Sequence, residues 1–185
     1  MIIDNAIKGN CVSLRTVTLE DAEYTYSIRS GGERTRFIHM LNGGIDQQKK
    51  WIQSQIDSQD SYFFIVIDIK GRPIGTYAIY EINLDLKTAI VGRALLNGNP
   101  IQNLEAIYLV HEFAFYFLEM EKIYTDVFEE NVAAVGVNKQ VGGMVTDRNF
   151  NEEFQLYNLR FEITRDNYNK KRMGIKRLVQ RFSNR

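Results

Sequence analysis

The residue types that most often act in catalysis and metal binding are scarce in this sequence. It holds two histidines, His39 and His111, and one cysteine, Cys11. No GxSxG nucleophile motif, HExxH zinc motif or GxxxxGK[ST] phosphate loop occurs. The sequence therefore gives no support to a serine hydrolase, a zinc protease or a P-loop enzyme. The same three residues do not supply the four ligands of a structural zinc site, and we expect no metal.

Length and composition are those of one globular domain. The chain has 185 residues, of which 44% are hydrophobic and 25% charged. A single cysteine excludes an internal disulfide and fits a reducing compartment. No signal-like start and no apolar run of about 20 residues occurs, so we expect no membrane span and a cytoplasmic location.

The formal net charge is zero, but it is unevenly distributed. Residues 165–185 hold eight Lys or Arg and one Asp, whereas residues 1–164 hold fifteen Lys or Arg and twenty-two acids. Without a global positive charge, we expect no nucleic-acid partner.

The hydrophobic pattern predicts a mixed α/β (α+β) fold with the order β-α-α-β-β-β-α-β-α-β-β. Thr18 with Asp21 indicates a helix start, Asp46 a second one, and the segment 70–73 a hairpin turn. The expected strands are 11–17, 62–69, 74–82, 88–96, 122–128, 144–148 and 154–163. The expected helices are 18–30, 47–58, 104–120 and 130–142, where Asn103 is a possible cap of the third.

Four segments in this order resemble the GNAT acetyltransferases, especially the branch of ribosomal-protein and nucleotide-amino-sugar acetyltransferases. They are Pro73-Ile74-Gly75, Ala89-Ile90-Val91-Gly92, Glu105-Ala106 with His111-Glu112-Phe113-Ala114-Phe115, and Lys122-Ile123-Tyr124 to Phe128 with Glu130-Asn131, Ala134 and Asn138-Lys139-Gln140-Val141-Gly142. The segment Phe161-Glu162-Ile163-Thr164-Arg165-Asp166 is similar to the closing strand. The resemblance covers about residues 11–166.

This resemblance implies a central mixed, mostly antiparallel and twisted sheet of about seven strands, splayed in the middle and flanked by helices. It implies a GNAT domain over residues 1–166, followed by a basic amphipathic segment, 167–185. The implied reaction is acetyl transfer from acetyl-CoA, bound as a cosubstrate without a metal, to a small-molecule amine.

Five residues are implied to contact acetyl-CoA. In the similar fold, backbone near Ala94 and Leu95 pairs with the pantetheine arm, Gln102 and Asn103 lie at the diphosphate loop, and Asn131 bonds the far amide of the arm. The other interpretation of Asn131 is a helix N-cap. The loop departs from the family pattern, because Ile101 and Asn103 stand where small residues are usual.

Three residues are candidates for proton transfer. Glu81 is the first candidate general base, since it lies near the end of a strand beside the implied acceptor site. His39 is the second, in the segment that usually lines that site. Asn138 stands where the family often has an acidic tyrosine; an amide cannot supply a proton at neutral pH. Each has a plain alternative: a solvated carboxylate, a loop histidine and an exposed helix residue. His111 is interpreted as packed or edge-exposed.

The basic end of the chain predicts an amphipathic helix. Ile175, Leu178, Val179 and Phe182 share one face. We expect this face to pack on its own domain or across a homodimer. The alternatives are capture of a phosphate-bearing substrate and binding to a membrane surface.

The leading functional hypothesis is N-acetylation of a nucleotide-linked amino sugar in surface-polysaccharide biosynthesis. The alternatives are acetylation of a protein N-terminus or of another small amine such as an aminoglycoside, and a non-catalytic GNAT-like module that binds CoA.

Overall fold

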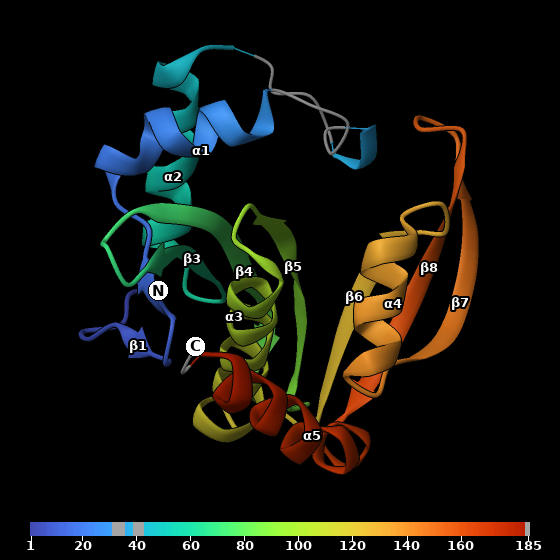
Figure 1. Cartoon of the computed structure of the whole chain (residues 1–185). Coiled ribbons are helices and arrows are strands. Elements are labelled where there is room, and N and C mark those ends of the chain that lie inside the picture. The colour runs from blue at the N-terminus through green and yellow to red at the C-terminus, as the bar shows by residue number, and fades with distance from the viewer. Residues whose placement is uncertain (31–35, 39–42, 184–185) are drawn as a thin grey trace.

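A computed structural model describes residues 1–30, 36–38 and 43–183 of the chain. These residues form one eight-stranded sheet in the order β1-β2-β3-β4-β5-β6-β8-β7 (Figure 1). The strands are β1 (Ile7–Lys8), β2 (Val12–Thr16), β3 (Tyr62–Asp68), β4 (Pro73–Asn83), β5 (Thr88–Leu96), β6 (Lys122–Phe128), β7 (Met144–Asn151) and β8 (Leu156–Thr164). All neighbours are antiparallel except β5 and β6, which are parallel. The predicted mixed, mostly antiparallel fold is confirmed, with the two-residue β1 as an eighth strand.

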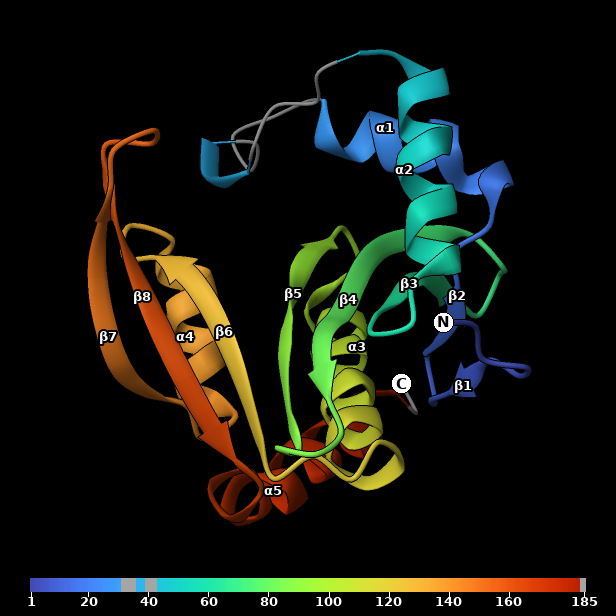
Figure 2. The same ribbon diagram turned by 180° about the vertical axis from the view of Figure 1, so that it is seen from behind.

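Helices cover both faces of the sheet. The helical segments are η1 (Leu19–Asp21), α1 (Ala22–Arg29), α2 (Ile45–Asp57), α3 (Pro100–Glu112), the π-helix η3 (Phe113–Phe117), α4 (Val132–Gln140) and α5 (Arg165–Ser183). In Figure 1, α3 and α4 lie in front of the sheet, and in Figure 2, seen from behind, the strands lie in front of them. We call these two sides the α3/α4 face and the α1/α2 face.

Two hydrophobic clusters match the two faces. Alternate residues of a strand point to opposite sides, so β4 sends Tyr77 and Ile79 into the cluster with α3. It sends Ala78 into the cluster with α1 and α2. Because β3 is covered on both faces, it is apolar almost throughout and buried. Strands β3, β4 and β5 therefore form a rigid base for the groups they carry.

Strands β5 and β6 pair at one end only. Thr88, Ala89 and Ile90 pair with Lys122, Ile123 and Tyr124, and no later pair joins the two strands among the described residues. Both strands continue, β5 to Leu96 and β6 to Phe128. Figure 2 shows them meeting beside α5 and diverging toward the opposite end. We call this diverging part the splay; it confirms the predicted opening in the middle of the sheet.

The helix after β5 begins earlier than the sequence pattern indicated. Asn99, not Asn103, is its N-cap: Asn99 Oδ1 accepts from the amides of Ile101 and Gln102, and Gln102 Oε1 accepts from the amide of Asn99. Pro100 takes the first helical position, which needs no amide hydrogen. The predicted start near Leu104 and the predicted Asn103 cap are therefore wrong.

Other helix boundaries follow the sequence more closely. Thr18 and Asp21 form the predicted capping box, which starts η1. The second helix is capped by Gly44 and includes Asp46, so the predicted Asp46 cap is wrong. In α5, Ile175 and Val179 are buried and Arg172 binds Glu112 of α3 at 2.5 Å. Half of the predicted apolar face therefore packs on its own domain, whereas Leu178 and Phe182 of the same face are 41% and 40% exposed.

Candidate active site

A bulge in β5 lies beside the splay. Thr76 of β4 pairs with Leu95, but Ala78 pairs with Gly92, so Arg93 and Ala94 together face the single residue Tyr77. Arg93 has a positive φ of 52°. Such bulges bend a strand and turn its side chains and amides to new directions. Thr76 Oγ1 donates to the Arg93 carbonyl at 3.2 Å, which fixes the bulged backbone.

The bulged half of β5 is paired on one side only. Its neighbour β4 takes one edge, while the other edge faces the splay, where β6 has moved away. Exposed amides and carbonyls at this edge suit the amide groups of an extended pantetheine arm, and an amide hydrogen can stabilise a developing oxyanion. Ala94 and Leu95, which the resemblance implied as cofactor contacts, lie on this edge.

The N-terminus of α3 directly follows the end of β5. Gly98 is close-packed there: a Cβ would lie 2.9 Å from Asn103 Oδ1 and from Ile74 Cδ1. Asn103 Oδ1 is buried and has no hydrogen-bond partner among the described residues. A turn without a side chain lets a ligand approach the helix N-terminus closely, where backbone N–H groups suit an anion such as the diphosphate of CoA. The unpaired Asn103 oxygen is an acceptor and suits a donor group of the ligand, not the diphosphate itself.

Asn99 and Gln102 already occupy part of the place where a diphosphate would bind at the N-terminus of α3. The Asn99 side chain already accepts from the amides of Ile101 and Gln102, which a diphosphate would use. A ligand at this end of α3 therefore takes over hydrogen bonds that the capping box makes. Gln102, implied to contact the cofactor, is a member of this box.

Asn131 lies across the splay from these groups, at the start of α4 just after β6. Its Oδ1 accepts from the amide of Ala134 at 3.2 Å, so the N-cap interpretation is confirmed. The cap uses the oxygen of the carboxamide, and the NH₂ group can still donate to a ligand. Both strand ends at the open end of the splay thus carry polar groups.

The opposite, α1/α2 face of the splay holds a carboxylate that the sequence analysis did not single out. On β6, Ile123 packs in the core with α3, and Thr125 donates to Asn138 of α4. Alternation therefore places Tyr124 and Asp126 on the α1/α2 face. Asp126 is the first residue of this face beyond the last β5–β6 pair. Asp126 is exposed, with 32% of its side chain accessible, so its burial is only partial. This partial burial raises its pKa, the charge of Arg160 opposes that rise, and the charge of Asp147 adds to it.

Tyr80 of β4 reaches over β5 toward this carboxylate. Its hydroxyl lies 3.2 Å from the position of a Cβ on Gly92, so Gly92 provides the space that the tyrosine ring occupies. Burial raises the pKa of Tyr80, and the charges of Arg93, Asp126, Glu81 and Arg160 all act on it. Tyr80 therefore lies within electrostatic reach of both sides of the splay.

The three sequence candidates for proton transfer have different positions. Glu81 is exposed and has a positive φ of 51°. It lies in a bulge of β4 between Tyr80 and Asn83, near the end where β5 and β6 still pair. His39 lies outside the described residues. Asn138 is buried, accepts from Thr125 Oγ1 at 2.6 Å and donates to the Ala134 carbonyl at 2.9 Å. The interpretation of Asn138 as an exposed helix residue is therefore wrong.

His111 is packed in the interior, which confirms one of its two interpretations. Its Nδ1 lies 2.7 Å from the Ile107 carbonyl, and its ring stacks on Tyr168. Burial lowers its pKa to about 4, so it is neutral near pH 7. Both contacts lie within the α3–α5 interface, away from the splay.

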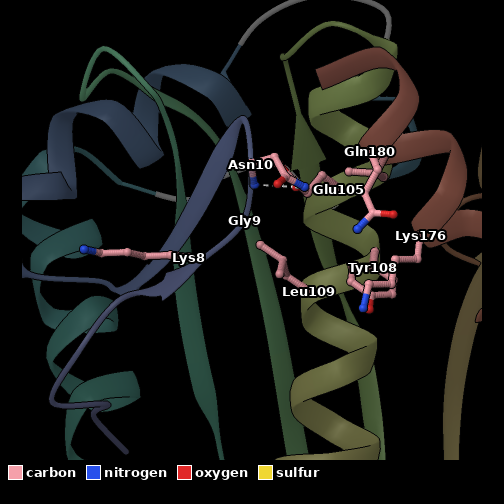
Figure 3. A pocket seen from close by; sticks show the side chains of 9 residues that line it. Lys8, Gly9, Asn10, Glu105, Tyr108, Leu109, Lys176 and Gln180 are labelled. Carbon is pink, nitrogen blue, oxygen red and sulfur yellow. Dashed lines mark hydrogen bonds between the residues drawn. The ribbon is translucent and has the colours of Figure 1, made fainter. Parts of the chain in front are cut away.

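A pocket of about 310 Å³ lies elsewhere, between the β1–β2 turn, α3 and α5 (Figure 3). Its wall includes Glu105, which accepts from the amides of Asn10, Cys11 and Val12 at 2.6 to 2.9 Å. Figure 3 shows Glu105 turned toward Asn10. The carboxylate thus ties the first hairpin to α3 and has a structural role.

The described part of the chain has neither a metal-binding cluster nor a membrane-spanning helix. In residues 1–30, 36–38 and 43–183, no three His, Cys, Asp or Glu side chains are grouped so that they could hold a metal ion. Over the same ranges, no helix combines the length and apolarity needed to cross a membrane.

Comparison with known proteins identifies the family. The acetyltransferase (GNAT) domain family matches residues 12–144. The chain is 26% identical over 151 residues to the probable N-acetyltransferase YjcK of Bacillus subtilis strain 168, covering 74% of this chain and 82% of that protein. The apo structure of FdhC, a nucleotide-linked sugar GNAT, superposes with a TM-score of 0.78 at 22% identity, over 96% of this chain and 99% of that one. Spermidine N-acetyltransferase from Vibrio cholerae, in complex with CoA and spermine, gives 0.77 at 19% identity, over 85% and 97%.

Proposed function

Because the chain belongs to the acetyltransferase (GNAT) family and is an N-acetyltransferase, we propose that it acetylates a primary amine on a nucleotide-linked amino sugar. Acetyl-CoA supplies the acetyl thioester. The observation that carries this proposal is the position of Asp126 on the α1/α2 face, where β5 and β6 have just parted. A carboxylate at this point can receive the proton of an amine that approaches from that face.

The proposed chemistry uses two groups of this chain. Asp126 accepts a proton from the acceptor ammonium, and the backbone amides of bulged β5 hydrogen-bond the carbonyl oxygen as it gains charge. The amine nitrogen then forms a C–N bond while the C–S bond breaks. In sum, R–NH₃⁺ and the acetyl thioester give R–NH–CO–CH₃, the thiol of CoA and one proton, which passes to solvent through Asp126.

Direct transfer needs no strong acid at the leaving group. A thiol has a pKa of about 8.5, so the thiolate leaves readily near neutral pH. This is consistent with Asn138, which cannot supply a proton and whose amide is engaged with Thr125 and Ala134. Glu81 stays a second proposal for the general base, and His39 a third.

The choice of acceptor rests on charge and on similarity. A polyamine is a polycation, whereas the α1/α2 face beside the splay carries Arg93, which takes part in none of the ion pairs found among the described residues. A nucleotide-linked sugar carries phosphate groups that suit arginine. The superposition with FdhC, which covers nearly all of both chains, supports the same choice.

Release of free CoA thiol across a panel of amines tests the proposal. The panel includes nucleotide-linked amino sugars, free amino sugars, aminoglycosides, spermidine and peptides with free N-termini. We expect the highest kcat/KM with a nucleotide-linked amino sugar. Preferred turnover of spermidine or of a peptide contradicts the proposed acceptor, and CoA binding without turnover of any amine contradicts the proposed reaction.

The proposal includes a cellular setting. We propose that the enzyme acts in the cytoplasm, in surface-polysaccharide biosynthesis, as a homodimer. Size-exclusion chromatography with light scattering tests the dimer: a mass near 43 kDa, twice the 21.5 kDa of one chain, is expected, and a monomer mass at micromolar concentration contradicts it.

A further inference from the structure

Arg93 is an unusual residue at the edge of the splay. It has a positive φ, which few non-glycine residues adopt, and it lies in the β5 bulge with an exposed side chain. Strained backbone of this kind persists where the surrounding structure holds it and is concentrated at functional sites. The bulge places the arginine side chain on the α1/α2 face, since its guanidinium contacts α2.

Three neutral groups hold the guanidinium in place. Its carbon lies 4.2 Å from the centre of the Tyr80 ring and 5.7 Å from that of Trp51. Nη1 donates to Gln55 Oε1 at 2.6 Å. The ion pairs found among the described residues do not include Arg93. The group is oriented on two aromatic faces and an amide, and its charge is not matched by a carboxylate there.

A second arginine lies close to the first. Arg29 ends α1, and its pKa is lowered by burial and then by the positive charge of Arg93. Arginine is the side chain best shaped to bind phosphate oxygens in pairs.

Arg93 lies on the same face as the proposed acceptor amine. Tyr80 connects the two places, because its ring stacks on Arg93 and its hydroxyl approaches the backbone of Gly92 at the splay. Asp126 acts electrostatically on the same tyrosine from the other side. A ligand that reaches from Arg93 to Asp126 thus passes over Tyr80.

From this arrangement we infer that Arg93 binds a phosphate group of the acceptor while the amine of the same molecule lies at Asp126. This inference rests on the proposed function and adds a phosphate subsite on the α1/α2 face. That subsite is separate from the N-terminus of α3, where the CoA diphosphate is expected. It makes Arg93 the residue that distinguishes a phosphate-linked amino sugar from the free sugar.

Steady-state kinetics of Arg93→Gln test the subsite. We expect KM for the nucleotide-linked amino sugar to rise about 10- to 100-fold, as for loss of a charge-assisted hydrogen-bond pair. We expect kcat, KM for acetyl-CoA and KM for the same sugar without phosphate to change less than about twofold. Arg93→Lys keeps the charge but not the paired donors, so its KM should be intermediate. Arg177→Gln, at an exposed arginine of α5 that takes part in none of the ion pairs found among the described residues, is the matched control and should match wild type.

A binding measurement separates failure of the subsite from failure of the proposed function. With CoA saturating the α3 end, inorganic pyrophosphate should raise the melting temperature of the wild type but not that of Arg93→Gln. If no nucleotide-linked sugar is a substrate but this difference is found, the proposed acceptor is wrong and the subsite stands. Equal pyrophosphate effects on both proteins, or an equal rise of KM for phosphate-free and phosphate-linked sugars, overturns the subsite.

Discussion

The two sides of the splay carry the same pair of residue types in different electrostatic surroundings. On the β4–β5 side, Arg93 stacks on Tyr80; on the β6–β8 side, Arg160 lies 4.9 Å from the Tyr124 ring. Arg160 lies in one cross-strand row between Asp126 of β6 and Asp147 of β7, 3.7 Å from the Asp126 carboxylate.

The difference shows how an arginine's partners indicate its role. Arg160 has two aspartates beside it, so its charge is balanced inside the protein and it modulates the carboxylate that faces the splay. Within the described part of the chain, the side chain of Arg93 contacts two aromatic rings and an amide and joins no ion pair, so its charge remains directed to a ligand. One side of the splay thus suits proton transfer and the other suits binding.

Replacing the carboxylate of the β6–β8 side should have the largest effect. Asp126→Asn keeps size and shape but removes the proton acceptor, so we expect kcat/KM to fall about 100- to 1,000-fold. Thiol release with saturating acetyl-CoA measures it, and an unchanged melting temperature excludes misfolding. Glu81→Gln is the matched control and should cost less than about threefold. A large loss with Glu81→Gln and none with Asp126→Asn would assign the base to Glu81 instead.

The sequence contains enough information for most of the framework. Strands 88–96 and 122–128 have the predicted bounds, because both are β-branched or apolar runs between clear turn residues. The start of α3 differs from the prediction because the apolar helical pattern indicates a start only near Leu104, although Asn99-Pro100 is itself a start signal.

The site was harder to predict, because its key residues depend on contacts between distant segments. Asp126 alternates with apolar residues on its strand, as solvent-facing residues also do. Its importance follows from the parting of β5 and β6 and from Tyr80, 46 positions earlier in the chain (126 minus 80). The bulge at Arg93 is likewise invisible in the sequence, because it is defined by the register with β4.

The second-largest effect is expected for Glu105, which ties α3, behind the β4–β5 side of the splay, to the first hairpin. Glu105 of α3 is 1% exposed and accepts from three backbone amides of the first hairpin. Glu105→Ala leaves these donors without partners, so we expect a loss of about 3 kcal/mol in the free energy of unfolding, measured by urea denaturation. Glu152→Ala, an exposed acid at the β7–β8 turn, should cost less than about 0.5 kcal/mol. Equal stability of the two variants would contradict the anchoring role.

On the β6–β8 side, the side-chain amide of Asn138 connects α4 to β6, and its loss should lower the stability less than the loss of Glu105. Asn138→Ala removes the acceptor of the buried Thr125 hydroxyl, so we expect a loss of about 1 to 2 kcal/mol in stability. Because this amide is buried between α4 and β6, kcat at a permissive temperature should change less than about threefold. Thr125→Ala with the double variant completes a cycle whose coupling energy should be near 1 kcal/mol. A large fall of kcat with unchanged stability would restore Asn138 as a catalytic residue.

The smallest effect concerns the charge balance of the row Asp126–Arg160–Asp147. Burial and Asp147 raise the pKa of Asp126, and Arg160 lowers it. Removing the positive charge in Arg160→Gln therefore raises this pKa further, and the base becomes ionised only at higher pH. The acidic limb of the kcat/KM profile should shift upward by about half a pH unit. Asp147→Asn removes a repelling charge, so it should shift the same limb downward. Because the two variants should shift the acidic limb in opposite directions, a general loss of stability cannot explain both shifts. Shifts in the same direction, or none in either variant, would mean that a group other than Asp126 controls the acidic limb.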